Sequence, residues 1–327
     1  MSSNSNSNVD RYNKYMNKLR IMGAESVFGF SVCEEMDQVI ITKYIENEDE
    51  YRVIEIPSFV TDVQMYIFRD VGQSLKIIHK DNQIDNMALM FGGFEGKILD
   101  LSEFDTTGAD NMNKMFYNSK CSEINICNFN TSSARYMTSM FECCTKLKRI
   151  NLRSFDTSKV TKMDSMFEKC SSLTELDLSN FDTHKVVGMS AMFKKCSSLE
   201  KLDISRFDTK EVIDMASMFM DCINLKILDT SNFETPSIYS ANNMFNGCEK
   251  LEHIDVSKFT IKEYTDICCM FTGCYSLKEL DLRKFHKVNN KGCVVGLFNG
   301  CKELKEPITD NEFLIGLYKS RGIVGWR

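Results

Sequence analysis

Residues Met166–Met189 read MFEKCSSLTELDLSNFDTHKVVGM, and variants of this stretch follow one another through most of the 327-residue chain. The Met-Phe pair at its start recurs every 25 to 27 residues, and Leu297 with Phe298 closes the series. A second phenylalanine column keeps the same step. Two columns in phase identify internal repeats of roughly 26 residues, which must stack into a solenoid because one unit cannot enclose a core alone. The pairs begin at Met90, Met115, Met140, Met166, Met192, Met218, Met244 and Met270, and the second column is Phe104, Phe129, Phe155, Phe181, Phe207, Phe233, Phe259 and Phe285.

Each repeat contains two different local patterns. Leu176 and Leu178 alternate with polar residues, which is the two-residue period of a short strand with one buried face. After a turn, Val186, Met189 and Met192 follow at spacings that suit a helical or 3-10 turn. In a stack of such repeats, adjacent strands would lie about 4.8 Å apart in a parallel sheet.

The segments LxxLDLSxFDT and MFxxCxxL resemble the 26-residue leucine-rich repeats of BspA-like bacterial surface proteins, over about residues 85–305. The resemblance implies an α/β repeat fold. The expected fold is a leucine-rich-repeat solenoid, with a parallel β-sheet on the concave face and short helical or 3-10 turns on the convex face. It also implies a role in adhesion or in binding a host protein.

The sequence outside the regular repeats predicts caps. We expect a flexible tail and lead-in over residues 1–20, and an N-terminal cap with a β-hairpin and an entering coil over 21–84. We read Val39–Val60, followed by Phe68 and Ser74–Ile77, as this hairpin and entering coil. The repeats are assigned to residues 85–305 and a C-terminal cap to 306–327, where Glu312–Tyr318 suits a short helix and Trp326 follows in the tail. The caps would cover the open ends of the stack, where unpaired edge strands invite aggregation.

Composition excludes several classes of protein. With 43% hydrophobic and 26% charged residues, the chain can bury a core. The net charge of -6 and the lack of a Lys/Arg stripe argue against a nucleic-acid partner. No run of 18 apolar residues predicts a membrane span, and the first residues lack the features of a secretory signal. We therefore expect a cytoplasmic protein, or a cell-surface protein if a signal was trimmed.

Seven of the fourteen cysteines follow the repeat, and we expect most of the fourteen to be reduced. One cysteine per coil follows the Met-Phe turn, where an inward-facing small hydrophobe fits. Cys121, Cys143 and Cys293 fall outside that column and are candidate reactive thiols. The four histidines are scattered, so no zinc site and no other cofactor is predicted. The repeat cysteines are Cys144, Cys170, Cys196, Cys222, Cys248, Cys274 and Cys301.

A polar column follows the outward face of the predicted sheet, at Asp100, Asn125, Asn151, Asp177, Asp203, Asp229, Asp255 and Asp281. Neighbouring carboxylates about 5 Å apart repel by roughly 1 kcal/mol in water-like surroundings and by roughly 3 kcal/mol at an effective dielectric constant of 20. Hydrogen bonds to the serine beside each Asp, or pairing with Lys201 or Arg283, could offset this repulsion. Alternatively, the column meets a basic partner surface or divalent cations. The candidate partner-binding residues are Asp177, Ser179, Lys201, Asp203, Ser205, Asp229, Ser231, Asp255, Ser257, Asp281 and Arg283.

The sequence favours binding over catalysis. It contains no GxSxG, no GxxxxGK[ST], no HExxH and no GxGxxG motif between a strand and a helix. We predict a non-enzymatic scaffold whose concave sheet, centred on the coils from Leu173 to Leu282, docks a protein. A cytoplasmic inhibitor or effector that covers another protein, a surface adhesin, and a self-associating structural protein stay open as alternatives.

Overall fold

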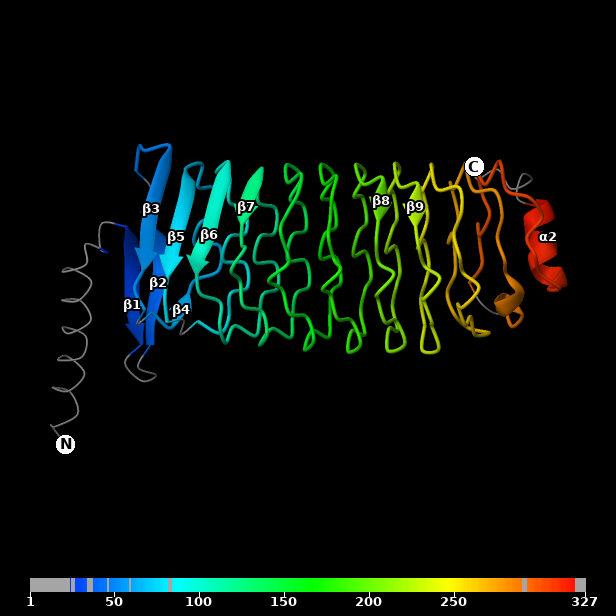
Figure 1. Ribbon diagram of the computed structural model, residues 1–327, viewed down its shortest axis with the longest axis horizontal. Coiled ribbons are helices and arrows are strands. Elements are labelled where there is room, and N and C mark those ends of the chain that lie inside the picture. The colour runs from blue at the N-terminus through cyan, green and yellow to red at the C-terminus, as the bar shows by residue number, and fades with distance from the viewer. Residues whose placement is uncertain are drawn as a thin grey trace, which may run out of the picture.

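The protein is a solenoid of parallel coils with few helices, as the repeat predicted. The computed structural model describes residues 24, 27–33, 38–45, 47–58, 60–81, 84–289 and 293–320. Figure 1 shows the coils side by side along a nearly straight axis, with helix α2 (Glu312–Ser320) at the C-terminal end. No helix among these residues is both long and apolar enough to cross a membrane. The expected tail at residues 1–20 and Trp326 lie outside the described residues.

The closest connection between coils runs through the segment that holds the Met-Phe pair, here called the Met-Phe arm and illustrated by Met163–Cys170. Every second N–H group of the arm donates to a carbonyl of the following coil, whereas the N–H groups between them close i→i+3 turns within the coil. Isolated parallel bridges continue this ladder from Asn86 to Asp266. At one junction the bonds run from Met163, Ser165, Phe167 and Lys169 to the carbonyls of residues 188, 190, 192 and 194, at distances of 2.7 to 3.0 Å.

Left-handed backbone conformations make this alternation possible. Ser165 and Lys169 have φ angles of 55° and 60°, and the equivalent residues of the other coils repeat the pattern. A positive φ rotates the peptide group, so that its N–H points along the stack instead of into its own turn. A non-glycine residue in this region costs roughly 1–2 kcal/mol. Each regular coil has two such left-handed positions, and most of them hold a residue other than glycine. Glycine occupies one of the two in some coils, as at Gly247 and Gly273.

The opposite side of each coil, here called the sheet arm and illustrated by Leu173–Phe181, is less regular than predicted. Formal strands occur in β6 (Ile98–Phe104), β7 (Glu123–Asn125), β8 (Lys201–Leu202) and β9 (Ile227–Leu228), whereas the coils between β7 and β8 are extended without a continuous ladder. The predicted alternation still holds, because Leu178 is buried and Asp177 and Ser179 are exposed. The convex turns were expected to be helical or 3-10. The described Met-Phe arms are successive turns instead, and the 3-10 helix η2 (Arg283–Phe285) lies at the end of a sheet arm.

The spacing of the stacked rings differs between the two arms. Phenylalanines of the Met-Phe arms stack nearly parallel, with centroids 5.5 Å apart for Phe141 and Phe167. On the sheet side, the rings of Phe129 and Phe155 are 6.3 Å apart. The coils are therefore held more closely at the Met-Phe arm, where the backbone ladder runs, than at the sheet arm. Both columns belong to one continuous buried core.

The N-terminal end has a different strand arrangement from the one expected. The hairpin pairs β1 (Phe28–Cys33) with β2 (Gln38–Tyr44), and β2 also pairs in parallel with β4 (Asp62–Val63). β3 (Tyr51–Ile56) joins the solenoid sheet beside β5 (Ser74–His79), so the hairpin consists of β1 and β2, within the residues 21–84 assigned to the cap. The resulting sheet order is β3-β5-β6-β7.

At the C-terminal end, helix α2 covers the last coil. Asn311 caps the helix, since its side-chain oxygen accepts hydrogen bonds from the backbone of Phe313 and Leu314 at 3.0 and 3.3 Å. Its side-chain amide donates to carbonyls of residues 285, 286 and 288, which ties the cap to the preceding coil. The ring of Tyr318 meets Phe298 edge-on at 6.2 Å and so ends the phenylalanine stack.

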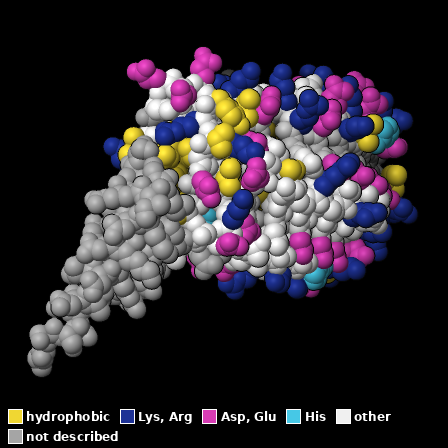
Figure 2. Space-filling model, turned by 60° about the vertical axis from the view of Figure 1, so that its left-hand side comes forward, with side chains coloured by type: hydrophobic (Ala, Val, Ile, Leu, Met, Phe, Trp, Pro, Cys, Tyr) yellow, Lys and Arg dark blue, Asp and Glu magenta, His cyan; other side chains and the backbone are white. Residues whose placement is uncertain are grey.

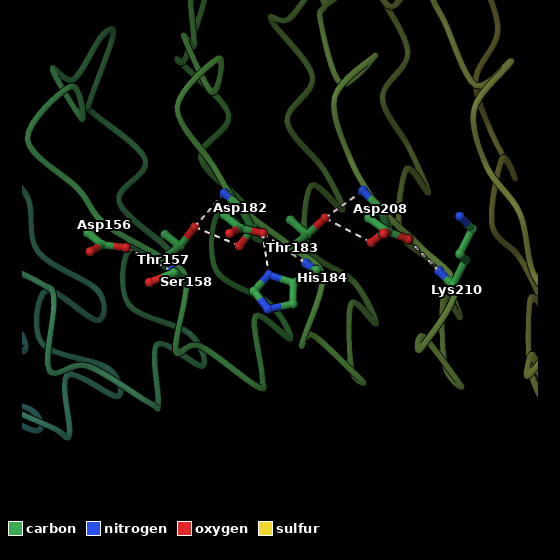
Figure 3. A network of polar contacts seen from close by, with 8 residues as sticks. All are labelled: Asp156, Thr157, Ser158, Asp182, Thr183, His184, Asp208 and Lys210. Atoms are coloured by element: carbon green, nitrogen blue, oxygen red, sulfur yellow. Dashed lines mark hydrogen bonds and ion pairs between the residues drawn. The ribbon is translucent and has the colours of Figure 1, made fainter.

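Each regular coil has a buried threonine whose hydroxyl makes hydrogen bonds to the backbone of the following coil. The hydroxyl of Thr183 donates to the carbonyl of Asp208 and accepts from the N–H of the same residue, both at 2.8 Å. Figure 3 shows this contact and the identical one between Thr157 and Asp182. One side chain therefore satisfies both backbone groups of a residue in the following coil, and we call this row the threonine ladder. Its members include Thr106, Thr131, Thr157, Thr183 and Thr209.

Replacing Thr183 by valine should destabilise the protein by about 2 kcal/mol. The substitution keeps the shape of the side chain but removes two hydrogen bonds to Asp208, each worth roughly 1 kcal/mol. Urea unfolding followed by circular dichroism measures the change. Thr183→Ser is the matched control, because it keeps the hydroxyl and loses only a methyl group. If valine and serine variants unfold at the same urea concentration, the hydroxyl contributes nothing.

Replacing Lys195 by glycine should raise the free energy of unfolding by roughly 0.5–1 kcal/mol. Lys195 is exposed and has a φ of 61°, so glycine removes the left-handed penalty, only partly offset by its greater freedom in the unfolded chain. Lys195→Ala removes the same side chain and keeps the penalty, so we expect it to be nearly neutral. Equal unfolding midpoints for the two variants would contradict this account.

Candidate functional site

The aspartates of the outward column cap their own turns. Each side-chain oxygen accepts a hydrogen bond from the N–H two residues later, at 3.1 Å for Asp177, 3.0 Å for Asp203 and 2.9 Å for Asp229. Asn125 and Asn151 make the same contact at their positions in the column. The hydrogen bonds from Ser179, Ser205, Ser231 and Ser257 to this column were predicted, and all four are present through the serine N–H.

These contacts keep the carboxylates ionised. Hydrogen bonding to Ser179, Ser205 and Ser231 holds the pKa values of Asp177, Asp203 and Asp229 below the usual range. The remaining repulsion works in the opposite direction, since Asp177 raises the pKa of Asp203 and Asp203 raises that of Asp229. The hydrogen bonds outweigh the repulsion, so the column carries negative charge at neutral pH.

Among the described residues, ion pairs occur only at the ends of the Asp177–Asp281 part of the column. Arg153 lies 3.5 Å from Asp177, and the guanidinium of Arg283 pairs with Asp281 and lowers its pKa. Within the described part of the chain, Asp203, Asp229 and Asp255 are in no ion pair, although Arg206 lies near enough to lower the pKa of Asp203. The predicted partner Lys201 is exposed and forms no ion pair with these aspartates either. The middle of the column is thus acidic without a neutralising partner.

Neighbouring columns of the sheet arms neutralise themselves. Lys226 pairs with Glu200 at 3.0 Å, and Lys278 pairs with Glu252 two junctions further on. Figure 2 shows the same intermixing, with Lys/Arg and Asp/Glu side chains interspersed over the face that it draws. The unpaired aspartates therefore differ from the other charged columns of this surface.

An exposed apolar side chain lies beside them. Ile227 is 68% exposed, although it is part of β9 and stands two residues before Asp229. A large aliphatic side chain in water gains free energy when a partner covers it, on the order of 1.5–3 kcal/mol for full burial. The sequence analysis did not identify Ile227 as part of the site.

A shallow groove of about 970 Å³ lies further toward the N-terminus. Apolar residues such as Ile124 and Ile150 line it together with charged side chains of both signs, and Tyr51 of β3 also lines it. Figure 2 shows hydrophobic side chains gathered near this end. Asp177 is the one predicted partner-binding residue that lines the groove, so the hollow and most of the predicted site occupy different coils.

The candidate reactive thiols are not activated. Cys121 is buried, and burial raises its pKa to about 12. Burial also raises the pKa of Cys143. Cys293 forms a disulfide with Cys268, so the expectation of a free thiol there was wrong. The 25-residue separation of this pair is one coil, a relation that the spacing of the repeat cysteines did not reveal.

The repeat cysteines are packed in the core and donate hydrogen bonds. The Sγ of Cys196 donates to the carbonyl of Phe167 at 3.1 Å, and that carbonyl also accepts the N–H of Cys170. Burial raises the pKa of Cys170 and Cys196 well above the ordinary value. Ser119 occupies the same position in an earlier coil, and its hydroxyl donates to Phe94. The position therefore selects a small buried donor, and its thiols are inert.

The sequence analysis did not identify one exposed apolar surface. Ile213 and Tyr239 are 49% and 73% exposed, and the N–H of Tyr239 donates to the carbonyl of Ile213 in the coil before it. Tyr264 follows in the next coil and is 66% exposed. The repeat pattern gave no signal for this edge, because these residues stand at variable positions of the template.

The family model described as "Mycoplasma protein of unknown function, DUF285" matches residues 85–201, 137–252 and 188–311. No curated protein sequence matches the chain.

Among solved structures, the chain is similar to a leucine-rich-repeat protein of Treponema pallidum, with 18% identity over 82% of this chain and 96% of the other and a TM-score of 0.36. A Bacteroides ovatus leucine-rich-repeat protein has 17% identity over 86% of this chain and 92% of the other, with a TM-score of 0.35. A leucine-rich cell-surface protein of Faecalibacterium prausnitzii has 15% identity over 88% and 94%, with a TM-score of 0.32.

Replacing Asp203 by asparagine should leave the protein as stable at pH 7, whereas Asp203→Ala should lower its melting temperature by roughly 1–2 °C. Asparagine keeps the acceptor of the turn, as Asn125 and Asn151 do, while alanine removes it. Differential scanning calorimetry measures both values.

The pH dependence provides the second readout. A lowered folded-state pKa contributes stability that is complete above the unfolded value of about 3.9 and is lost as the pH falls through the folded value. The Asp203→Asn/Asp229→Asn variant should therefore lose less stability than the unmodified protein between neutral pH and about pH 3. An unchanged pH profile would show that these carboxylates do not gain from folding.

Proposed function

This chain belongs to the DUF285 family, and from that premise we propose that it is a non-enzymatic scaffold that docks a protein partner on its sheet face. The sheet face is formed by the outward side chains of the sheet arms. The family match agrees with the BspA-like repeats identified in the sequence, and a repeat scaffold is compatible with binding.

One observation supports this role most directly. Asp203, Asp229 and Asp255 stand one per coil without an ion pair among the described residues, and Ile227 is exposed beside them. Hydrogen bonding lowers the pKa of Asp203 and of Asp229, so these two are ionised. Because each aspartate is held by its own turn, its position does not depend on a flexible loop. The charges are already ordered before a partner binds. Binding would therefore cost this chain little conformational entropy.

The chemistry of the surface specifies the kind of partner. Carboxylates at the spacing of the coils complement Lys or Arg side chains on a protein surface, and charge complementarity directs both association rate and specificity. The exposed Ile227 adds an apolar contact near the middle, where binding energy usually concentrates. We therefore infer a partner with a basic surface and an apolar contact point.

We propose no catalytic role. The carboxylates of the column repeat the same environment from coil to coil, whereas acid–base catalysis needs two groups whose pKa values are set apart. The inhibitor or effector role and the adhesin role would use the same surface. Fractionation of the native cell, with detection by antibody, separates these two roles by compartment.

Reversing the charge of Asp203 and Asp229 together, to lysine, should reduce partner affinity at least 100-fold and leave the fold intact. The substitution replaces attraction by repulsion at two neighbouring coils. Partners are captured from the native cell with the unmodified protein, identified by mass spectrometry, purified, and then measured against each variant by titration calorimetry. Circular dichroism verifies the fold.

The matched control reverses the charge of Asp156 and Asp208. These residues cap turns in the same way, but they follow the sheet arm, directly after Phe155 and Phe207, and are not part of the outward column. We expect this control to bind normally. If the Asp203/Asp229 variant binds as tightly as the control, the sheet face is not the docking surface.

A further inference from the structure

Three potential metal ligands meet near the C-terminal end of the stack. One oxygen of Asp266 and the sulfur atoms of Cys268 and Cys293 all lie within 4.8 Å of one another. Asp266 and Cys268 are two residues apart in one Met-Phe arm, and Cys293 belongs to the next coil. The backbone ladder sets this register, since the N–H of Ile267 donates to the carbonyl of Cys293 at 2.9 Å.

These cysteines differ from the repeat cysteines in their surroundings. Cys268 is half-buried and Cys293 is exposed, whereas the repeat thiols are buried and hydrogen-bonded to carbonyls of the preceding coil. Cys268 and Cys293 form a disulfide, with their Cα atoms 5.2 Å apart. Solvent and small reductants therefore have access to the bond.

We propose that this pair is a redox-gated metal site: when the disulfide is reduced, Cys268, Cys293 and Asp266 bind a Zn²⁺ ion. A dithiol reductant transfers two electrons and two protons to the disulfide and is itself oxidised to a cyclic disulfide, which leaves two protein thiols. Zn²⁺ then replaces the two thiol protons and forms two Zn–S bonds and one Zn–O bond. Solvent supplies the fourth ligand, as at zinc sites with three protein ligands.

The dimensions suit this ion. Zn–S bonds of about 2.3 Å in a tetrahedral site place two thiolates roughly 3.8 Å apart. Cysteines close enough for a disulfide can open to that separation by side-chain rotation, with the backbone in place. Thiolate ligands also favour zinc over magnesium and calcium, which prefer oxygen.

The carboxylate is already oriented by its neighbours. One oxygen of Asp266 accepts the N–H of Cys268 at 3.0 Å, and the other accepts the side-chain amide of Asn242 at 2.9 Å. Such hydrogen bonds fix the direction of a metal-binding carboxylate. Asn242 lies in the preceding coil, so residues of three consecutive coils build the site.

The site lies on Met-Phe arms, away from the aspartates of the sheet face, and does not rest on the proposed docking function. It joins the same two coils in both redox states, through a disulfide when oxidised and through the metal when reduced. Cys269 is adjacent in sequence, but its sulfur donates to the carbonyl of Val295 at 3.5 Å and is not in the group of three.

Zinc titration of the full chain tests the proposal. The protein is reduced with dithiothreitol, freed of the reductant without air, and titrated with Zn²⁺ against a chromophoric chelator. We expect the reduced protein to bind about one equivalent and the oxidised protein to bind none at the same affinity. Co²⁺ in place of Zn²⁺ should give a thiolate-to-cobalt charge-transfer band.

Variants assign the ligands. Cys268→Ser, Cys293→Ser and Asp266→Asn should each weaken binding at least tenfold, while Cys269→Ser should bind like the unmodified protein. Circular dichroism establishes that each variant is folded. The proposal is overturned if reduced protein binds no zinc, if oxidised protein binds equally, or if any of the three ligand variants retains full affinity.

Discussion

The backbone hydrogen bonds between successive Met-Phe arms are the constraint on which the rest of the structure depends. They fix the distance and the register of neighbouring coils, so that identical side chains fall into columns. The stacked rings of Phe167 and Phe193, the inert thiols and the threonine ladder all follow from that register. The sheet arms are attached to this ladder and are less closely paired than the arms that carry it.

The repeat period, the buried columns and the position of the outward aspartates could be predicted from the sequence, because each depends on spacing alone. Leu178 and Cys196 are buried for the reason that their periodicity indicated. The left-handed residues could not be predicted: Ser165 and Lys169 have no side-chain preference for that conformation, and only the neighbouring coils impose it. The hairpin partner of β2 could not be predicted either, because β2 and β3 both have strand-like sequences and differ only in the sheet that they join.

For the candidate site, the sequence identified the charged column but not its energetics. Asn125 and Asn151 were a usable signal, because an asparagine at an aspartate position indicates a turn acceptor more than a charge. Whether Asp203 and Asp229 form ion pairs depends on which of the surrounding lysines and arginines come within ion-pair distance in space. The cluster of Asp266, Cys268 and Cys293 likewise depends on the register between coils, which residue spacing alone does not give.

The hydrogen bonds of the Met-Phe arms also have a polarity. In each arm the alternate N–H groups donate toward the following coil, and the carbonyls that accept them face back toward the preceding one. The peptide dipoles therefore add along the Met-Phe arms, with the positive end at the last coil. The bonds of the sheet arms, such as that from the N–H of Lys226 to the carbonyl of Glu200, run in the opposite direction. A coil inserted or deleted in the middle leaves both ends unchanged. The length of the molecule can thus vary by whole coils while its two caps keep their own chemistry.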